Sequence, residues 1–394
     1  MNAAANAHGL DGTLVTPDWP PLTLEEVRAL LNRYPGCCEP REILTVSPRP
    51  FSAAGVVRTQ SGSVFVKRHH RLVRDREGLL EEHRFIEHLH GNAAPVPRVL
   101  AAKSGETAIE AGVSTYEVHE VPRGVDLYGD AISWTPFRSV HHAYSAGQAL
   151  ADLHRASQGY PAPSRKPRPL VASFTIFADP NPALAMKRYL AARPALDGEP
   201  AIHTACDEAL DLLAPFHSEL VPLLPALEPL WTHNDFHASN LFWSDESAQA
   251  RAVAIIDFGL ANRTNTVHDL AHAIERNVVE WLALVENPEH FDQVPVHLDH
   301  LDALLAGYEL VRPLSAAEAA ALAPMTALCH AEFALTEANY FLGVLHSWNQ
   351  ARMAVPNYLV GHARWFQSGA GQMLLNELRR WANARTRPRR AARP

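Results

Sequence analysis

The sequence of 394 residues is poor in cysteine and lysine, and it contains no long apolar run. Its four cysteines are Cys37, Cys38, Cys206 and Cys329, with no Cys-x-x-Cys pair among them. Adjacent Cys37 and Cys38 cannot easily bridge each other, so the pattern predicts neither a disulfide framework nor a zinc ribbon. Reduced thiols in a cytosolic protein are the expectation that follows.

Two further absences limit the partners that we expect. No window approaches the roughly 18 uninterrupted apolar residues of a membrane helix, and the N-terminal MNAAANAHGLDG lacks the basic and apolar parts of a signal peptide. The formal net charge of −8 argues against general nucleic-acid binding, which needs a basic face. We therefore expect a cytoplasmic protein without a membrane or nucleic-acid partner, and the sequence does not predict its oligomeric state.

The residues that are present first indicate strands. Between residues 41 and 121, five short segments alternate apolar and polar residues, as half-buried strands do: EILTVSP, GVVRTQ, SVFVKRH, TAIEAG and STYEVHEV. The segment REGLLEEHRFIEHLHG instead repeats its apolar residues with the period of a helix. Residues 41–121 are therefore predicted to form an N-terminal lobe with a small antiparallel sheet and one helix.

The chain on either side of this lobe has a different character. Residues 1–40 are predicted to be an extension with one short helix, which begins with a capping box of Thr23 and Glu26. Residues 122–378 are predicted to be mainly helical, with one β-hairpin and an exposed Pro- and Arg-rich connection, YPAPSRKPRPL. Residues 379–394 are basic and low in apolar residues, and we expect them to be disordered.

The stretch WTHNDFHASNLFW carries His233, Asp235 and His237 at alternating positions. Alternate residues of a strand point the same way, so these three could share a metal ion, as zinc ligands do. The residues that follow supply no convincing further ligand, however. The zinc interpretation is therefore disfavoured.

A second interpretation combines this stretch with AVAIIDFGLA, residues 252–261. The first stretch contains His-x-Asp-x-x-x-x-Asn and the second contains Asp-Phe-Gly, and a hairpin between them would bring Asn240 and Asp257 together. Phosphoryl transfer from ATP needs oxygen ligands that hold Mg²⁺ and a separate carboxylate that takes the proton of the acceptor hydroxyl. In this layout Asp235 is the base, and Asn240 and Asp257 are the metal ligands.

The combination of HNDFHASN with IIDFGLA resembles the aminoglycoside phosphotransferase and choline kinase-like family, whose members are small relatives of protein kinases. The resemblance covers about residues 41–375. It implies an α+β, protein-kinase-like fold of two lobes, with the nucleotide bound by the N-terminal lobe. It also implies an enzyme that uses ATP and Mg²⁺ to phosphorylate an alcohol group.

The resemblance implies roles for two charged residues of the N-terminal lobe. Lys67, one of only four lysines, would hold the α- and β-phosphates from the third strand, and a glutamate of the following helix would pair with it. Leu79, Glu82 and Ile86 share one face of that helix, so Glu82 is the expected partner. Glu81 is the alternative if the helix phase slips by one residue.

Two more segments would contact the nucleotide if the resemblance holds. The phosphate-covering loop falls in PRPFSAAGVV, where Ser52 and Gly55 would let backbone amides approach phosphate. This loop has a single glycine, unlike the glycine-rich loop of protein kinases. At the hinge between the lobes, the carbonyl of His119 and the amide of Val121 would bind the adenine edge.

Other polar residues near the motifs are expected to be structural. His154 is predicted to be a structural histidine, and His233 to brace the catalytic loop. Asp269 would cap a helix, or tie down the backbone of the catalytic loop as the resemblance implies. Asn234 stands where related kinases often have glycine, and its effect stays open, as does the role of His237.

The acceptor is expected to be a small polar molecule, such as an amino sugar or an amino alcohol. Only 12 positions separate Asp257 from Asp269, which leaves no room for the long activation segment of a regulated protein kinase. The acceptor cleft would then be built by the C-terminal helices. Six residues of these helices are candidates for its lining: Glu275, Glu280, Glu332, Glu337, Tyr340 and Trp348.

Two alternatives stay open. The stretch LLEEHRFIEHLHGNAAPVPRVL resembles the bacterial stress response kinase, which phosphorylates serine or threonine in proteins and also lacks a long activation segment. A nucleotide-binding pseudokinase regulator is disfavoured, because degenerate members usually lose one of five residues that are all present here: Lys67, Glu82, Asp235, Asn240 and Asp257.

Overall fold

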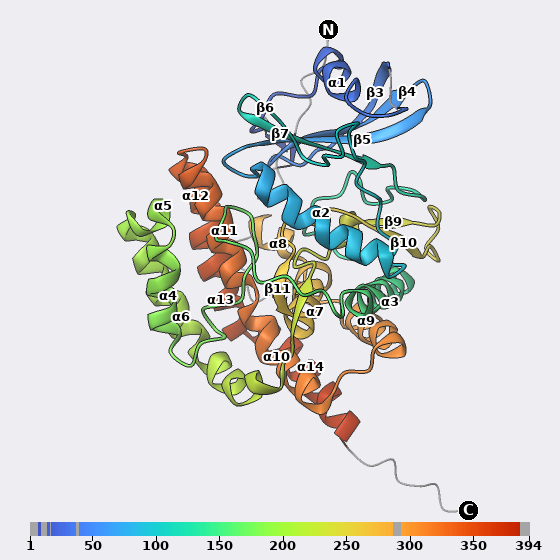
Figure 1. Cartoon of the computed structure of the whole chain (residues 1–394). Coiled ribbons are helices and arrows are strands. Elements are labelled where there is room, and N and C mark those ends of the chain that lie inside the picture. The colour runs from blue at the N-terminus through green and yellow to red at the C-terminus, as the bar shows by residue number, and fades with distance from the viewer. Residues whose placement is uncertain (1–6, 9–13, 16, 37–38, 287–292, 387–394) are drawn as a thin grey trace, which may run out of the picture.

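The computed structural model describes residues 7–8, 14–15, 17–36, 39–286 and 293–386. Within these residues the chain forms a smaller lobe built on a sheet and a larger lobe made mainly of helices (Figure 1). The α+β, protein-kinase-like architecture inferred from the sequence is confirmed.

The sheet of the N-terminal lobe has five antiparallel strands in the order β3-β4-β5-β7-β6. All five lie where alternating residues predicted strands: β3 (Pro40–Val46), β4 (Ala53–Thr59), β5 (Gly62–His70), β6 (Ile109–Ala111) and β7 (Ser114–Glu120). Because successive side chains of a strand point to opposite faces, Val64 and Val66 of β5 enter one apolar cluster. Lys67 and His69 lie on the other face, which is the face toward the site.

Helix α2 (Arg76–Gly91) lies between the sheet and the helical lobe (Figure 1). It begins at the N-cap Asp75, whose side chain accepts the backbone N–H of Gly78 at 2.7 Å. His83 of α2 contacts the sheet, and Phe85 packs against Trp231 of the helical lobe with ring centroids 5.2 Å apart. One helix thus connects both lobes.

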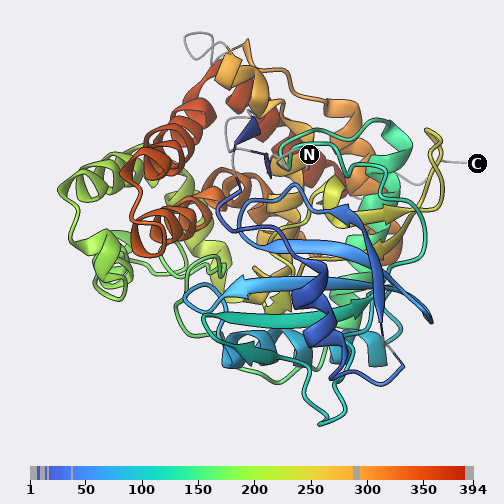
Figure 2. The same ribbon diagram turned by 90° about the horizontal axis from the view of Figure 1, so that it is seen from above.

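Helix α1 (Leu24–Leu31) covers the sheet on the side away from α2 (Figure 2), and it begins with the predicted capping box of Thr23 and Glu26. Its apolar residues join the cluster that contains Val64 and Val66. Glu26 also accepts a hydrogen bond from Arg68 of β5 at 2.7 Å. The short strands β1 (Ala7–His8) and β2 (Leu14–Val15) precede α1 and pair with each other. The helix of the predicted extension therefore packs as part of the N-terminal lobe.

The C-terminal lobe is built around a large apolar core. Its α-helices are α3 (Val140–Ala156), α4 (Pro182–Ala191), α5 (Pro194–Asp197), α6 (Pro200–Leu220), α7 (Thr266–Val278), α8 (Trp281–Glu286), α9 (Leu298–Val311), α10 (Ala316–Leu328), α11 (His330–Gly343), α12 (Trp348–Arg352), α13 (Gly361–Gln367) and α14 (Gly369–Thr386). Helices α3 and α9 touch backbone to backbone at Gly147 and Gly307. A Cβ at Gly147 would lie 2.1 Å from the carbonyl oxygen of Leu304, so only glycine fits.

Two small antiparallel pairs carry the motif residues. β9 (Leu241–Trp243) pairs with β10 (Ala252–Ile255), which confirms the predicted hairpin, and β8 (Pro229–Thr232) pairs with β11 (Asn262–Asn265). A short 3₁₀ turn, Ala238–Asn240, leads into β9. The backbone N–H of Ile256 donates to the carbonyl of Asn240 at 3.0 Å, which brings Asp257 beside the catalytic loop.

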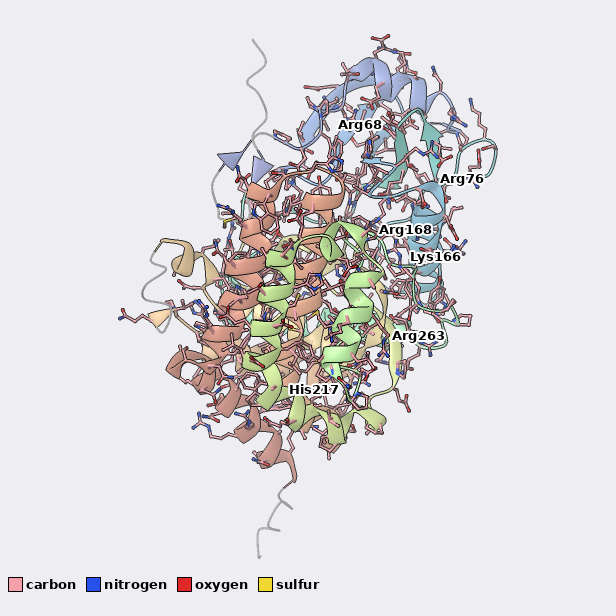
Figure 3. The ribbon with its side chains drawn as sticks, turned by 90° about the vertical axis from the view of Figure 1, so that its left-hand side faces the viewer. Arg68, Arg76, Lys166, Arg168, His217 and Arg263 are labelled. Atoms are coloured by element: carbon pink, nitrogen blue, oxygen red, sulfur yellow. The ribbon has the colours of Figure 1, made fainter. Side chains whose placement is uncertain are left out.

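The Pro- and Arg-rich stretch is mostly exposed or half-buried and lies outside helices and strands, as predicted, but it is not exposed throughout. Arg165, in the Pro- and Arg-rich stretch, is buried, because this stretch runs against α2 and the Asp-Phe-Gly turn and its arginines bind carboxylates there. Figure 3 shows Lys166 and Arg168 of this stretch next to α2 and its Arg76. The predicted disordered tail is helical over residues 379–386, where it continues α14 as far as Thr386, and its residues 387–394 lie outside the described chain.

The thiol prediction is tested for two of the four cysteines. Cys206 and Cys329 are free and buried, whereas Cys37 and Cys38 lie outside the described residues. Burial raises the pKa of the Cys206 thiol to about 12, so this thiol stays protonated at neutral pH. None of the helices in the described part of the chain is both long enough and apolar enough to cross a membrane.

Candidate active site

The catalytic loop between β8 and β9 is held by Asp269 of α7. Asp269 accepts the backbone N–H of His233 at 2.9 Å and that of Asn234 at 2.7 Å, one with each carboxylate oxygen. His154 Nε2 lies 3.0 Å from the same carboxylate, which confirms its structural role. The N-cap of α7 is Asn265. Asp269 therefore ties down the loop and does not cap the helix.

Asn234 stabilises the loop through its backbone conformation and its side-chain hydrogen bonds. Its backbone has a φ of 61°, a left-handed conformation that asparagine tolerates better than most residues. Its side-chain Oδ1 accepts hydrogen bonds from the hydroxyls of Thr232 at 3.0 Å and Thr264 at 2.9 Å, and lies 3.1 Å from His268 Nδ1. The side chain that stands in place of a glycine thus connects β8, β11 and α7.

His233 braces the loop as predicted. Its Nε2 lies 2.9 Å from the carbonyl oxygen of Ile256, and its Nδ1 accepts the backbone N–H of Asp235 at 3.2 Å. Both ring nitrogens are used by the backbone, so His233 has none left for a metal shared with His237. This geometry agrees with the rejection of a zinc site.

Asp235 is surrounded by positive and hydrogen-bonding groups. Arg276 Nη2 lies 3.1 Å from one carboxylate oxygen, while His237 Nε2 at 3.6 Å and Asn240 Nδ2 at 3.3 Å approach the other. Burial alone would raise the pKa of Asp235, but the charges of His237 and Arg276 outweigh burial and hold this pKa well below its ordinary value. The carboxylate is therefore ionised at neutral pH.

Asn240 and Asp257 present oxygens that fit a divalent cation. The amide nitrogen of Asn240 donates to the backbone carbonyl of Asp235 at 2.9 Å, and its Oδ1 accepts no hydrogen bond from any described residue. One carboxylate oxygen of Asp257 accepts from Lys67 Nζ at 3.0 Å. Burial would raise the pKa of Asp257, but the charge of Lys67 outweighs burial and lowers it. An ionised carboxylate and an amide oxygen are typical magnesium ligands.

The predicted ion pair between Lys67 and Glu82 is not formed. Glu82 is buried, as the helix phase predicted, but it binds Arg74 at 2.6 Å and Arg165 at 2.8 Å. Lys67 binds Asp257 instead. The physical reason is that two buried guanidinium groups already use the Glu82 carboxylate, and neither could be left without a partner at this depth.

Lys67 has a second acidic neighbour, which the sequence analysis missed. Glu117 of β7 is paired in register with Lys67. Burial would lower the pKa of Lys67, but the charges of Asp257 and Glu117 outweigh burial and raise it. Glu117 itself contacts the Nε2 atoms of His69, His83 and His119 at 2.8–2.9 Å. Its carboxylate is therefore held by three imidazoles.

The predicted phosphate-covering loop leads from β3 into β4 and contacts the helical lobe. Ser52 lies immediately before β4, whereas Gly55 lies inside β4. A Cβ at Gly55 would come within 2.3 Å of the carbonyl oxygen of Thr45 in β3, so strand packing accounts for this glycine. Arg49 of the same loop donates to Ser239 Oγ of the catalytic loop at 2.6 Å, and Phe51 packs edge-on against Tyr340.

The two hinge residues differ in their backbone environment. On its outer side, β7 pairs with residues 98–100 through the carbonyl of Val118 and the N–H of Glu120. Because backbone groups alternate in direction along a strand, the carbonyl of His119 points toward β5. This pairing argues against the predicted adenine contact of His119. Val121 follows the last residue of the strand, where its N–H is not required by the sheet.

A hollow with a volume of about 70 Å³ opens beside Asp235. Its lining includes Arg276 and Glu337 together with the aromatic residues Trp134 and Phe333. The Arg276 guanidinium lies over both rings, 3.8 Å from the centroid of Trp134 and 4.1 Å from that of Phe333. Arg49 and Phe51 close the hollow from the N-terminal lobe.

Of the six residues proposed to line the acceptor cleft, Glu337 lines this hollow. Most of the others have structural partners. Glu332 accepts the backbone N–H of Ile176 at 2.5 Å, Glu275 lies 2.8 Å from His362, and Tyr340 donates to Asp18.

Comparison with known proteins decides the family. A family model described as "Phosphotransferase enzyme family" matches residues 51–314, which is more than half of the chain. The chain belongs to this family. The recognition of the aminoglycoside phosphotransferase-like motifs is thereby confirmed.

Individual relatives are distant. A homoserine kinase of Rhodospirillum rubrum is 26% identical over 246 residues, which cover 60% of this chain and 61% of that protein. A microcompartment-associated aminopropanol kinase superposes with a TM-score of 0.57 at 16% identity, covering 90% of this chain and 98% of that structure. An aminoglycoside phosphotransferase of Alicyclobacillus acidocaldarius gives a TM-score of 0.53 at 16% identity, with coverages of 93% and 98%. These structures establish the fold.

Sequence reasoning missed four arginines of this region: Arg49, Arg74, Arg165 and Arg276. Arginine is common in this chain, so no single arginine attracts notice. Arg276 had a usable indication, because it lies seven residues after Asp269 on the same helix and therefore on the same face. The others depend on loops whose course no periodicity describes.

Proposed function

We propose that this chain transfers the γ-phosphoryl group of ATP to a hydroxyl of a small polar molecule. The observation that carries the proposal is the closeness of three groups around the motif loop. The ionised Asp235 lines the hollow, Asn240 Nδ2 lies 3.3 Å from its carboxylate, and the hydrogen bond from Ile256 N–H to the carbonyl of Asn240 brings the Lys67-bound Asp257 beside them. The family match and the phosphate acceptors in the names of the relatives support it. Because ATP is the donor, we also propose a cytoplasmic location.

In the proposed mechanism Asp235 orients the acceptor hydroxyl and takes its proton. Its low pKa suits a loose transition state, in which the proton leaves late and a weak base is sufficient. Mg²⁺, held by Asn240 Oδ1 and Asp257, would supply positive charge to the phosphate oxygens. Lys67 fixes Asp257 at 3.0 Å and would supply a further positive charge to the phosphates. The backbone before β4, at Ser52, would cover them.

The small volume of the hollow, about 70 Å³, supports a small acceptor over a segment of a protein substrate. Arg49 and Phe51 approach from the N-terminal lobe, while Trp134 and Phe333 close the opposite side. A protein substrate would need an open groove for its chain on both sides of the hydroxyl. The protein kinase alternative is therefore kept only as an outcome of the test.

The test is transfer of phosphate from Mg-ATP to a panel of amino sugars, amino alcohols, hydroxy amino acids and a generic protein, followed by ³¹P NMR. We expect ester formation with a small alcohol. Asp235→Asn should lower kcat by about 10³-fold, with Mg-ATP affinity within about twofold. Asp152→Asn, an exposed aspartate of α3, is the matched control. Native-rate transfer by Asp235→Asn, or transfer to protein alone, would contradict the proposal.

A further inference from the structure

Two ionisable side chains in the wall of the hollow keep buried polar atoms that make no hydrogen bond, although Arg276 also lies 3.1 Å from Asp235 and 3.8 Å from Glu275. Arg276 is 2% exposed, and its Nε and Nη2 make no hydrogen bond to any described residue. Glu337 is 3% exposed, and its Oε2 has no partner there either. Buried polar groups in native proteins are nearly always paired, so these atoms in the wall of one hollow are available to bind a ligand.

Arg276 carries a positive charge, Glu337 carries a negative charge once it is ionised, and both flank the candidate base. Arg276 lies on α7, 3.1 Å from Asp235, and Glu337 lies on α11 in the wall of the same hollow. Arg49 also lines the hollow, but its Nη2 donates to Ala131 and Ser239. A ligand that satisfies the unpaired atoms therefore needs an anionic group for Arg276 and a cationic group for Glu337.

The size and the aromatic walls narrow the ligand further. A single water needs roughly 10–15 Å³ on the same measure, so a hollow of about 70 Å³ suits an acceptor of few non-hydrogen atoms better than an amino sugar with several rings. The Arg276 guanidinium covers one face of Trp134 and one face of Phe333, so these two faces cannot form an aromatic cage for a quaternary ammonium.

We propose that the acceptor is a small α-amino acid with a side-chain hydroxyl, whose carboxylate binds Arg276 and whose ammonium binds Glu337. This inference rests on the proposed function and specifies its substrate class. Arg276 would hold the carboxylate by charge-assisted hydrogen bonds and Glu337 the ammonium. The side-chain hydroxyl then lies next to Asp235. Both residues are specificity-determining contacts.

Three alcohols that share the same hydroxyalkyl skeleton test each contact separately. Homoserine carries both charged groups, 3-amino-1-propanol lacks the carboxylate, and 4-hydroxybutanoate lacks the ammonium. We expect kcat/KM for each truncated acceptor to be lower than for homoserine by about 10²-fold or more, since the missing group leaves a buried charge unpaired. Choline should not be phosphorylated.

Two variants connect each loss to its residue. In Arg276→Met the preference for homoserine over 3-amino-1-propanol should fall to within about threefold, because the carboxylate has lost its partner. In Glu337→Gln the preference over 4-hydroxybutanoate should fall in the same way. Using ratios cancels any general loss of kcat from disturbing Asp235. Glu280→Gln, which removes a half-exposed carboxylate that binds His297, should keep both ratios.

Each outcome is decisive. Equal turnover of the three alcohols by the native protein, or unchanged ratios in both variants, would overturn the inference. The native series alone decides if a variant does not fold. Transfer to amino sugars or choline only would overturn the substrate class but leave the phosphotransferase proposal intact. Absence of transfer to every alcohol would overturn the proposed function itself.

Discussion

Two buried groups of charged side chains lie near the Asp-Phe-Gly turn, and they differ in how completely their hydrogen bonds are made. In the first group, Glu82 accepts from Arg74 and Arg165. Arg74 also donates to the carbonyls of Pro169 at 2.8 Å and Gly259 at 2.7 Å, and Arg165 donates to Gly259 at 3.0 Å. This group connects α2, the Arg-rich stretch and the turn without leaving a free donor on Arg74 or Arg165.

The second group consists of Asp235, Arg276 and Glu337, and it is incomplete. Arg276 approaches Asp235 at 3.1 Å but makes no hydrogen bond with good geometry, and Glu337 has no partner among the described residues. An unpaired buried group costs about 1–3 kcal/mol, which a stable fold avoids unless a ligand restores the pairing. The comparison teaches that the first group has all its hydrogen bonds within the protein, whereas the second group has donors and acceptors left for the proposed ligand.

The largest effect should come from Asp257, the proposed metal ligand that lies close to the second group. Asp257→Asn removes a ligand charge and leaves Lys67 without its partner, so phosphotransfer should fall by about 10³-fold. Apparent Mg²⁺ affinity, measured by titrating activity, should fall at least about tenfold. Asp245→Asn, on the turn between β9 and β10, is the control. Unchanged Mg²⁺ dependence in Asp257→Asn would remove Asp257 from the metal site.

The next largest effect should come from the first group, which is centred on Glu82. Glu82→Gln leaves two buried guanidinium charges without a carboxylate, so the free energy of unfolding should drop by about 3–5 kcal/mol. The side chain of its neighbour Glu81 also binds Arg165 but is 18% exposed. Glu81→Gln should therefore lower the free energy of unfolding by less than about 1 kcal/mol. Urea denaturation of the two variants checks the difference. Equal losses would show that Glu82 is not the centre of a structural group.

A smaller effect concerns the pH dependence of acceptor binding by the second group. Burial raises the pKa of Glu337 to about 8, because its effect outweighs that of the positive charge of Arg276. The negative charges of Asp235 and Glu275 raise this pKa further. If a bound ammonium needs the ionised carboxylate, Glu337 must lose a proton below pH 8. The acceptor KM should therefore rise up to about tenfold for each pH unit below 8 and level off above it.

Glu337→Gln separates this titration from others nearby. Burial raises the pKa of Glu275 to about 7, so Glu275 titrates in the same range. The slope of KM with pH should disappear in Glu337→Gln if Glu337 is responsible. A slope that persists in this variant would assign the titration to another group.

The smallest effect should come from the N-terminal helix. Thr23 accepts the backbone N–H of Glu26 at 3.2 Å, and Thr23→Ala should lower the free energy of unfolding by about 1 kcal/mol while leaving kcat unchanged. Thermal unfolding and a kinetic assay check both parts. A change in kcat would mean that α1, on the far side of the sheet, influences the site.

Much of the fold was predictable because period and capping are local properties. Alternation located the strands of the sheet, the box at Thr23 located the start of α1, and helix phase turned Glu82 inward. The spacing of the motifs alone predicted that Asn240 lies near Asp257, because an antiparallel hairpin brings the residue before its first strand close to the residues after its second strand. These are features that a few consecutive residues determine.

What could not be predicted depends on partners far apart in the chain. Glu82 was assigned to Lys67 because nothing in the sequence reveals that the stretch around Arg165 folds back onto α2. The adenine contact of the His119 carbonyl was proposed before the pairing of β7 with residues 98–100 could be known. Arg276 and Glu337 meet only when α7 and α11 pack beside the loop.

The central claim is that Asn240 and Asp257 hold one divalent ion beside the Asp235 base. The most direct measurement is a crystal structure with Mn²⁺ and a non-hydrolysable ATP analogue, in which anomalous scattering locates the metal. The account predicts a peak within about 2–2.5 Å of Asn240 Oδ1 and of an Asp257 carboxylate oxygen. A metal bound to the nucleotide but out of reach of both residues would contradict it.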